Sequence, residues 1–244
     1  MESLITNNDS ATLIHHHFAE LQAKYPEFTL GQNLFGEWVV RGPICASAIY
    51  ETTELLIDGV TIEIKLPIVY PDTHPVARET TGLTDGFHTN DDGILCLGSP
   101  LAVKATFESC PTILGFMERL LIPFFFAFKY WKNHGEVPFG ELSHGGKGIL
   151  EYYMDIFDIS VEENILGFLQ ILADDSYRGH LPCPCNSKLI IRRCHGEMLR
   201  NLAKLQSQDD YFQDYCCIIK YFHDNKLPIS RKFLCKRALI KKRF

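Results

Sequence analysis

The sequence predicts an α+β protein with a small metal-binding module near its C-terminal end. Three observations carry this prediction: short β-type segments gather in residues 38–66, segments with helical periodicity flank them, and four metal-ligand side chains cluster in residues 183–195. The chain has 244 residues, of which 46% are hydrophobic and 22% charged. These proportions are typical of a globular protein with room for one large core and a smaller module.

Residues 12–24 are predicted to form a helix, because Leu13, Phe18 and Leu21 recur near helical spacing and Pro26 follows. Three consecutive histidines, residues 15–17, lie within this segment. Neighbouring side chains on a helix point in different directions, so the three rings cannot chelate one ion together. A solvated helix face is the simplest interpretation of this run.

The β-type segments are residues 38–42, 44–50, 54–57 and 60–66, the last with strict alternation of polar and apolar side chains. Asp58-Gly59, between the last two segments, is typical of a hairpin turn. Short strands joined by short turns predict a four-stranded antiparallel meander.

A Pro-rich extended segment and a loop carrying a single cysteine, residues 87–97, follow the predicted sheet. Helical patterns return at residues 112–131, 148–157 and 161–173. The most apolar stretch, residues 120–128, is too short to span a bilayer and is predicted to be a buried core helix, with no membrane partner. The Gly-rich segment 135–148, which contains His144, is most simply a loop between helices.

Four candidate metal ligands follow the pattern Cys-x-Cys-x8-Cys-His, and they are Cys183, Cys185, Cys194 and His195. Three thiolates and one imidazole form a closed tetrahedral site for Zn²⁺, which leaves no open coordination position for catalysis. The sequence therefore predicts a structural zinc ion. Nine cysteines without a signal sequence favour a reducing, cytoplasmic setting.

Charge divides the chain near this motif. Residues 181–244 carry 14 Lys and Arg against 5 Asp and Glu, a net charge of +9, whereas residues 1–180 carry 10 against 25, a net of −15. We therefore expect an acidic domain over residues 1–178 and a basic module over residues 179–244. The basic module suits nucleic acid, an acidic protein face, or the chain's own acidic domain.

The metal-binding run resembles the SEC-C motif, a small zinc-binding tail of the bacterial preprotein-translocation ATPase that is also fused to many other bacterial proteins. All four ligand positions match, but Asn186 and Lys188 stand where that motif usually has glycine. Asn tolerates a left-handed backbone, whereas Lys at position 188 adopts one only at a steric cost. The resemblance implies a structural zinc site that presents a surface to another macromolecule.

Residues 12–130 resemble the ubiquitin-conjugating (UBC) fold in the order of their elements and in three short motifs. Residues 70–76 read Tyr-Pro-Asp-Thr-His-Pro-Val, where the family has Tyr-Pro-x-x-Pro-Pro, and residues 93–97 read Gly-Ile-Leu-Cys-Leu. Residues 88–90 read His-Thr-Asn in place of the family's His-Pro-Asn. The nearest likeness is to divergent bacterial members, which occur in operons for ubiquitin-like conjugation and antiphage defence.

This resemblance implies that Cys96 accepts the C-terminal carboxyl group of a ubiquitin-like modifier, or of a partner protein, as a thioester. A separate activating enzyme and an acceptor protein are implied as well. In the family an Asn eight residues before the Cys assists the oxyanion; here His88 is eight residues before and Asn90 six, so either can be the donor. Asp92, with Asp91, is a candidate to orient the incoming amine, or simply part of a turn.

Two other classes of function compete with this interpretation. A catalytically silent UBC-like adaptor would only bind its partner protein, and Cys96 would then be an ordinary structural cysteine. A nucleic-acid adaptor would act through the basic zinc module. A reactive Cys96 distinguishes the transferase, and salt-sensitive nucleic-acid binding distinguishes the last class.

Overall fold

The computed structural model describes residues 7–50, 53–84, 87–90, 92–138, 143 and 145–237, and it has an α+β architecture. The chain forms two compact units. The first unit comprises Met1–Gly98 and Ala102–Glu141, and the second comprises Ser99–Leu101 and Leu142–Phe244.

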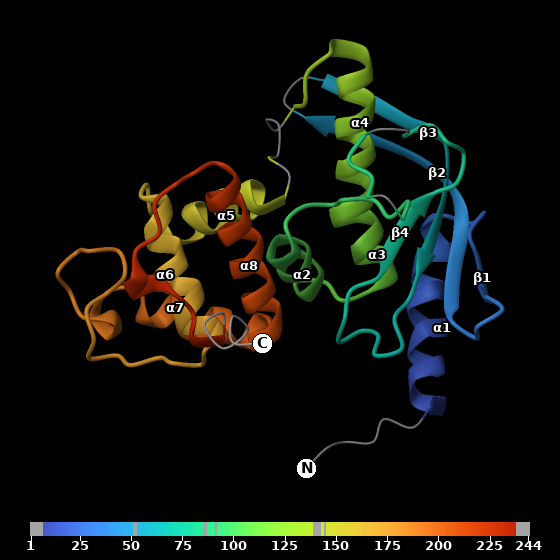
Figure 1. Ribbon diagram of the computed structural model, residues 1–244. Coiled ribbons are helices and arrows are strands. Elements are labelled where there is room, and N and C mark those ends of the chain that lie inside the picture. The colour runs from blue at the N-terminus through green and yellow to red at the C-terminus, as the bar shows by residue number, and fades with distance from the viewer. Residues whose placement is uncertain are drawn as a thin grey trace. The chain divides into compact units, whose positions relative to one another are not determined.

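The first unit contains a four-stranded antiparallel sheet in the order β1-β2-β3-β4 (Figure 1). The strands are β1 (Thr29–Gln32), β2 (Trp38–Tyr50), β3 (Thr53–Lys65) and β4 (Val76–Glu79). Each strand pairs with the next one along the chain, which confirms a four-stranded antiparallel sheet. The predicted strand division is wrong, because residues 38–42 and 44–50 belong to the single strand β2 and residues 54–57 and 60–65 to the single strand β3.

The predicted turn at Asp58-Gly59 is wrong, because both residues lie inside the long strand β3. Ala46 pairs with Ile57 and Ile44 pairs with Val60, so three steps along β3 face two along β2, as in a β-bulge. Ile57 and Val60 are both fully buried, and their packing keeps the two strands paired on either side of the irregularity. The connection between β2 and β3 lies instead at residues 51–52, outside the described residues.

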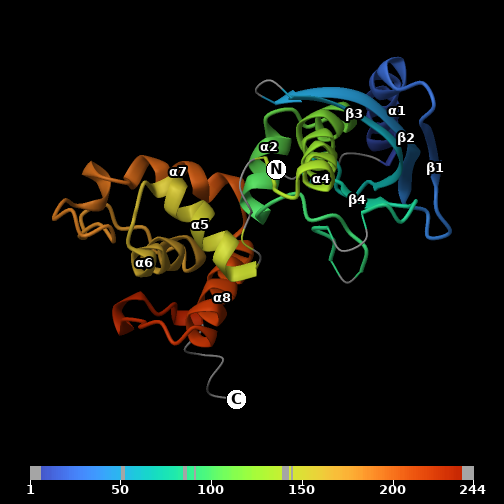
Figure 2. The same cartoon turned by 90° about the horizontal axis from the view of Figure 1, so that it is seen from above.

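Helices cover one face of the curved sheet (Figures 1 and 2). α1 (Asn7–Lys24) packs against α3 (Ile113–Phe116), and α4 (Ile122–His134) packs against β2 and β3. A short π-helical turn, Met117–Leu121, joins α3 to α4, so residues 113–134 form the helix expected over residues 112–131. Phe116 and Phe125 from this helix are fully buried in the same core as Ile62 and Ile64 of β3.

The three histidines of α1 have three different environments. His16 is exposed beside Glu20, and the ring of His15 lies 5.2 Å from that of Trp38. His17 is buried, with Nδ1 2.6 Å from the Tyr70 hydroxyl oxygen. The expected solvated face is therefore wrong for His17, which ties α1 to the segment after β3. Burial lowers the pKa of His17, because it penalises the charged form of the ring.

The second unit is helical, and its main helices are α5 (Gly145–Phe157), α6 (Glu162–Ala173), α7 (Gly196–Leu205) and α8 (Gln208–Asp224). α5 and α6 both pack against α8. Their apolar side chains share one core, so the boundary between compact units falls before α5 and not after residue 178. The Gly-rich segment 135–148 lies at this boundary; α5 begins inside it at Gly145, and His144 is outside the described residues.

A C-terminal strap, residues 229–237, crosses the second unit and closes its core. Phe233 is buried against Gly167 of α6, where an added Cβ would come within 2.6 Å of the Phe233 ring. The backbone N–H of Lys236 donates to the Asp174 carboxylate at 3.0 Å, just after the end of α6. The strap is thus held by both apolar packing and hydrogen bonds.

Among the described residues, no helix combines the length and apolar character that a bilayer crossing requires. The apolar stretch predicted as a core helix lies in the π-helical turn and α4, where Leu121, Phe125 and Phe126 are buried within the first unit.

Candidate metal centre and the Cys96 hairpin

Cys183, Cys185, Cys194 and His195 come together in the second unit, with their four ligand atoms all within 4.8 Å of one another. Cys185 Sγ lies 3.5 Å from Cys194 Sγ, and His195 Nδ1 lies 3.3 Å from Cys183 Sγ and 3.2 Å from Cys194 Sγ. Thiolates about 2.3 Å from a tetrahedral zinc ion stand about 3.8 Å apart, so the spacing and the donor types both fit. This group can hold a metal ion.

The metal loop, residues 176–195, brings the four ligands together from two arms. Pro182 and Ile190 form an isolated antiparallel bridge, and the Cys183 N–H donates to the Leu189 carbonyl at 2.8 Å. A short 3-10 turn, Ile191–Arg193, then leads to Cys194 and His195, and His195 is the N-cap residue of α7. The pairing returns the second arm beside the first.

The fourth ligand is oriented by the helical core. His195 Nε2 lies 2.9 Å from the Phe157 carbonyl oxygen at the end of α5, so Nε2–H donates there and Nδ1 faces the thiols. The rings of Phe157 and Phe168 pack edge-on against the imidazole, at 5.9 and 5.0 Å between centroids. Such outer contacts fix the tautomer and the ring orientation of a metal-binding histidine.

The thiols have unequal environments before an ion binds. Burial raises the pKa of Cys183 to about 12. Burial also opposes ionisation of Cys185, but hydrogen bonds with Ser187 and the neighbouring thiols outweigh it and lower the Cys185 pKa to about 6. Metal binding must therefore displace the proton of Cys183, which makes metal affinity fall as the pH falls.

Asn186 and Lys188, between the second and third cysteine ligands, both adopt left-handed backbone conformations. The φ angles are 61° at Asn186 and 64° at Lys188. The Asn186 amide also donates to Asn164 Oδ1, at 3.3 Å, and Asn164 is buried on α6. The turn thus keeps its glycine-like geometry, and strain is concentrated at Lys188.

We expect Lys188→Gly to stabilise the metal-loaded second unit by about 0.5–1 kcal/mol, because glycine avoids the left-handed steric cost of about 1–2 kcal/mol but loses more chain entropy. The matched variant Lys188→Ala removes the same side chain and retains that cost, so it should give no gain. Differential scanning calorimetry measures both shifts, and equal effects of the two variants would contradict the strain assignment.

In the first unit, Cys96 lies at the end of a small hairpin, residues 87–96, that is joined to the sheet. Thr89 bridges Leu95, and the Leu95 N–H donates to the Ala77 carbonyl of β4 at 2.9 Å. The Cys96 N–H donates to the His88 carbonyl at 2.7 Å. Sequence-predicted residues 88 and 96 are thus directly opposite one another, and the Asn90–Ile94 pair follows, with the Asn90 N–H 2.9 Å from the Ile94 carbonyl.

Cys96 is half-buried, while its neighbour Leu95 is buried in the sheet core with 4% of its surface exposed. Cys96 Sγ lies 4.0 Å from the Gly98 carbonyl oxygen. Gly98 has φ 144°, a left-handed value that glycine adopts without strain. The chain therefore turns immediately after Cys96 and leaves the thiol at the rim of the sheet.

Asp92 has a structural role in the hairpin. Its Oδ1 accepts the Ile94 N–H at 3.0 Å, and Gly93, between them, has φ 80°. This is the turn geometry that Asp-Gly sequences favour. Asp91 is outside the described residues.

Sequence reasoning missed the residues that support the metal ligands. The Phe157 carbonyl and the Asn164 side chain come from α5 and α6, and neither belongs to the ligand motif. Ser187 could have been predicted, because it lies between the ligands in the sequence. Its Oγ is 3.2 Å from Cys185 Sγ and 3.3 Å from Cys194 Sγ.

Comparison with known proteins finds no family model that matches this chain, and no curated protein matches it.

Proposed function

We propose that the first unit is a ubiquitin-conjugating-like transferase that carries a ubiquitin-like modifier, or the C-terminus of a partner protein, as a thioester on Cys96. The observation that carries this proposal is the pairing of Cys96 with His88 at the end of the hairpin. Acyl transfer through cysteine requires an accessible thiol and a hydrogen-bond donor near the oxyanion. Cys96 is half-buried, and the backbone hydrogen bond sets His88 opposite it in the hairpin.

The order of elements supports the same assignment. A helix, a four-stranded meander, the Cys96 hairpin and the helix α2 (Pro100–Glu108) succeed one another. This is the order that the UBC resemblance implies for residues 12–130. We place such a protein in a bacterial conjugation or antiphage defence operon, with a separate activating enzyme and an acceptor protein.

The proposed reaction has two acyl transfers. The Cys96 thiolate attacks the modifier's carbonyl carbon, held as a thioester on the activating enzyme, and the enzyme's thiolate leaves. An acceptor amine then attacks the Cys96 thioester, forms an amide and releases the Cys96 thiolate, while the amine's proton passes to solvent. Each tetrahedral intermediate needs a donor at its oxyanion, and we assign this role to His88, whose backbone is hydrogen-bonded to that of Cys96.

We further propose that the ion held by the second unit is Zn²⁺ with a structural role. The donor set of three thiols and one imidazole favours zinc, and the histidine's second nitrogen is already bound to the Phe157 carbonyl. When bound, the ion would join the two arms of the metal loop; no step of the acyl transfer involves it.

The test of the transferase is a covalent adduct. The protein is incubated with ATP, Mg²⁺ and each candidate modifier and activating enzyme encoded beside it, then run on a non-reducing gel. We expect a mass shift that thiol reductant removes and that Cys96→Ala abolishes. Cys45→Ala is the matched control, because Cys45 is an exposed cysteine of the same unit and should keep the adduct.

A non-catalytic UBC-like adaptor is the second candidate, and one observation favours it. The Asp92 carboxylate is used by the turn, where it accepts the Ile94 N–H, and this weakens its candidacy for orienting an amine. An adaptor would bind the modifier without forming an adduct. Binding that persists unchanged in Cys96→Ala, with no reductant-sensitive species in the wild type, would decide for it.

A further inference from the structure

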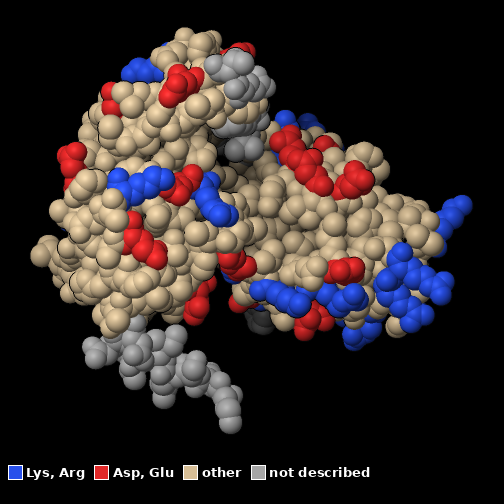
Figure 3. Space-filling model, turned by 180° about the vertical axis from the view of Figure 1, so that it is seen from behind, with Lys and Arg blue, Asp and Glu red and all other residues tan. Residues whose placement is uncertain are grey.

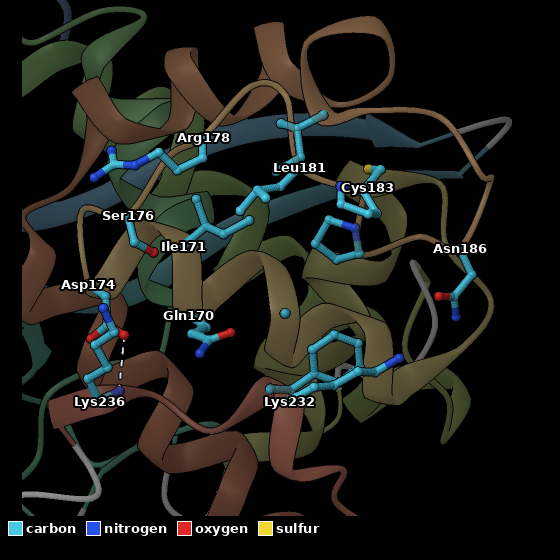
Figure 4. A pocket seen from close by; sticks show the side chains of 15 residues that line it. Gln170, Ile171, Asp174, Ser176, Arg178, Leu181, Cys183, Asn186, Lys232 and Lys236 are labelled. Atoms are coloured by element: carbon cyan, nitrogen blue, oxygen red, sulfur yellow. Dashed lines mark hydrogen bonds between the residues drawn. The ribbon is translucent and has the colours of Figure 1, made fainter.

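A pocket of about 560 Å³ lies in the second unit beside the metal loop (Figure 4). Three segments form its walls: the C-terminal half of α6, the metal loop and the C-terminal strap. Its volume is in the range of sites that bind ligands. The pocket is separate from the metal ligands themselves, apart from Cys183, which contributes to one wall.

The pocket has an apolar interior. Ile191 and Phe233 line it and are buried, and Ile171 and Leu181 lie near one another in its upper part (Figure 4). Leu181 exposes 46% of its surface, so this apolar side chain is open to solvent at the pocket. An apolar group entering the pocket would cover Leu181 and gain the stabilisation of apolar burial.

The rim of the pocket is cationic. Arg178, Lys232 and Lys236 line it, and within the described part of the chain none of the three side chains forms an ion pair with a carboxylate. Lys232 Nζ lies 4.4 Å from the Phe233 ring centroid, which holds a positive charge beside this buried apolar ring. The one lining carboxylate, Asp174, already accepts the Lys236 N–H and the Cys235 thiol.

We propose that this pocket binds an acidic peptide segment of a partner protein, with one large apolar side chain inserted against Leu181 and Phe233 and flanking Asp or Glu residues facing the rim. Charge complementarity selects this occupant, because three cations surround the opening and only one engaged carboxylate opposes them. Lys and Arg side chains also gather elsewhere on the second unit (Figure 3), which would attract an acidic partner over a longer range. The proposal does not depend on Cys96 chemistry.

Metal binding and peptide binding are linked in this arrangement. Cys183, Pro184 and Asn186 belong to the metal loop and line the pocket. The ion joins the two arms of the loop, so its removal would let the arms separate. The pocket wall that these residues form would then lose its shape. Peptide affinity should therefore require the metal.

The experiment begins with selection of random phage-displayed peptides on the metal-loaded full-length protein. We expect the enriched peptides to contain an aromatic or large aliphatic residue flanked by Asp or Glu. A fluorescent synthetic copy of one such peptide is then titrated, beside a copy in which Asn and Gln replace the acidic residues. Enrichment of basic or uncharged peptides, or no enrichment, overturns the proposal.

Charge reversal locates the site. The double variant Lys232→Glu, Lys236→Glu should weaken the synthetic peptide by at least about tenfold in fluorescence anisotropy. The matched control, Lys204→Glu with Lys220→Glu, makes the same change in net charge at exposed positions on α7 and α8 that do not line the pocket. Equal loss in both variants would assign binding to overall charge.

Two further arms separate the remaining outcomes. Leu181→Asp should weaken the peptide without affecting metal content, which zinc-dye titration measures. A fluorescent single-stranded RNA replaces the peptide in the last arm. Tighter, steeply salt-dependent RNA binding that the Lys232→Glu, Lys236→Glu variant removes would identify a nucleic-acid surface and reject the peptide site.

Discussion

Chelation of the metal ion is expected to open the metal loop and α7 while the first unit stays folded. The ion would bind the three cysteine sulfurs and His195 Nδ1 and so join both arms of the loop. Zinc-finger peptides gain about 10–16 kcal/mol in apparent binding free energy when they bind their ion. The gain here should be smaller, because the aromatic core around Tyr153, Phe168 and Phe222 remains without the ion.

Hydrogen-exchange mass spectrometry of the full chain measures this effect by region. On chelation, amides of residues 176–205 should lose most of their protection, whereas those of β2 and β3 should keep theirs. Cys194→Ser should reproduce the pattern with metal present, and Cys217→Ser, at an exposed cysteine of the same unit, should not. Loss of protection throughout both units would contradict the independence of the first unit.

Replacing His88 with alanine is expected to slow acyl transfer from Cys96 by about 100- to 1,000-fold, the cost of removing one oxyanion donor. The hairpin pairs the backbone of His88 directly with that of Cys96, while Asn90 belongs to a pair beyond Thr89 and Leu95. Asn90→Ala should therefore have the smaller effect. The measurement is single-turnover discharge of the Cys96 adduct to free lysine, followed on non-reducing gels.

The matched variant His88→Asn distinguishes a donor role from a structural one. The φ angle of His88 is 41°, a left-handed value that asparagine adopts more readily than alanine does, so this variant preserves the turn and restores an amide donor. Partial recovery of rate identifies the side chain as a donor. If Asn90→Ala slows the transfer more than His88→Ala does, the donor is Asn90, two residues nearer in sequence to Cys96.

The metal ligands were predictable because they are close in sequence and their chemistry has few alternatives. Cys185 and Cys194 are nine residues apart, and a short antiparallel return is enough to join them. Their support was not predictable, because the Phe157 carbonyl that orients His195 is a backbone group 38 residues away. Nothing in side-chain identity identifies such a partner.

The fold followed the sequence where periodicity is decisive and departed from it where tertiary packing decides. Alternation in residues 61–66 correctly predicted a strand, but Asp58-Gly59 indicated a turn that the buried pair Ile57 and Val60 overrides. Likewise, the sequence pattern of α5 and α6 shows that each has an apolar face but not which core that face joins. Only their packing against α8 assigns them to the second unit.

The C-terminal strap also sets an order of events during synthesis. Phe233 packs against Gly167 of α6 and completes the core there, but Gly167 is synthesised much earlier. The Gly167 surface of α6 therefore stays uncovered while the metal loop, α7 and α8 are translated. The sheet of the first unit is complete by the time α4 has emerged. During synthesis the first unit can thus be folded while the core of the second unit is still incomplete. At that stage the exposed apolar surface beside α6 is where chaperones would bind.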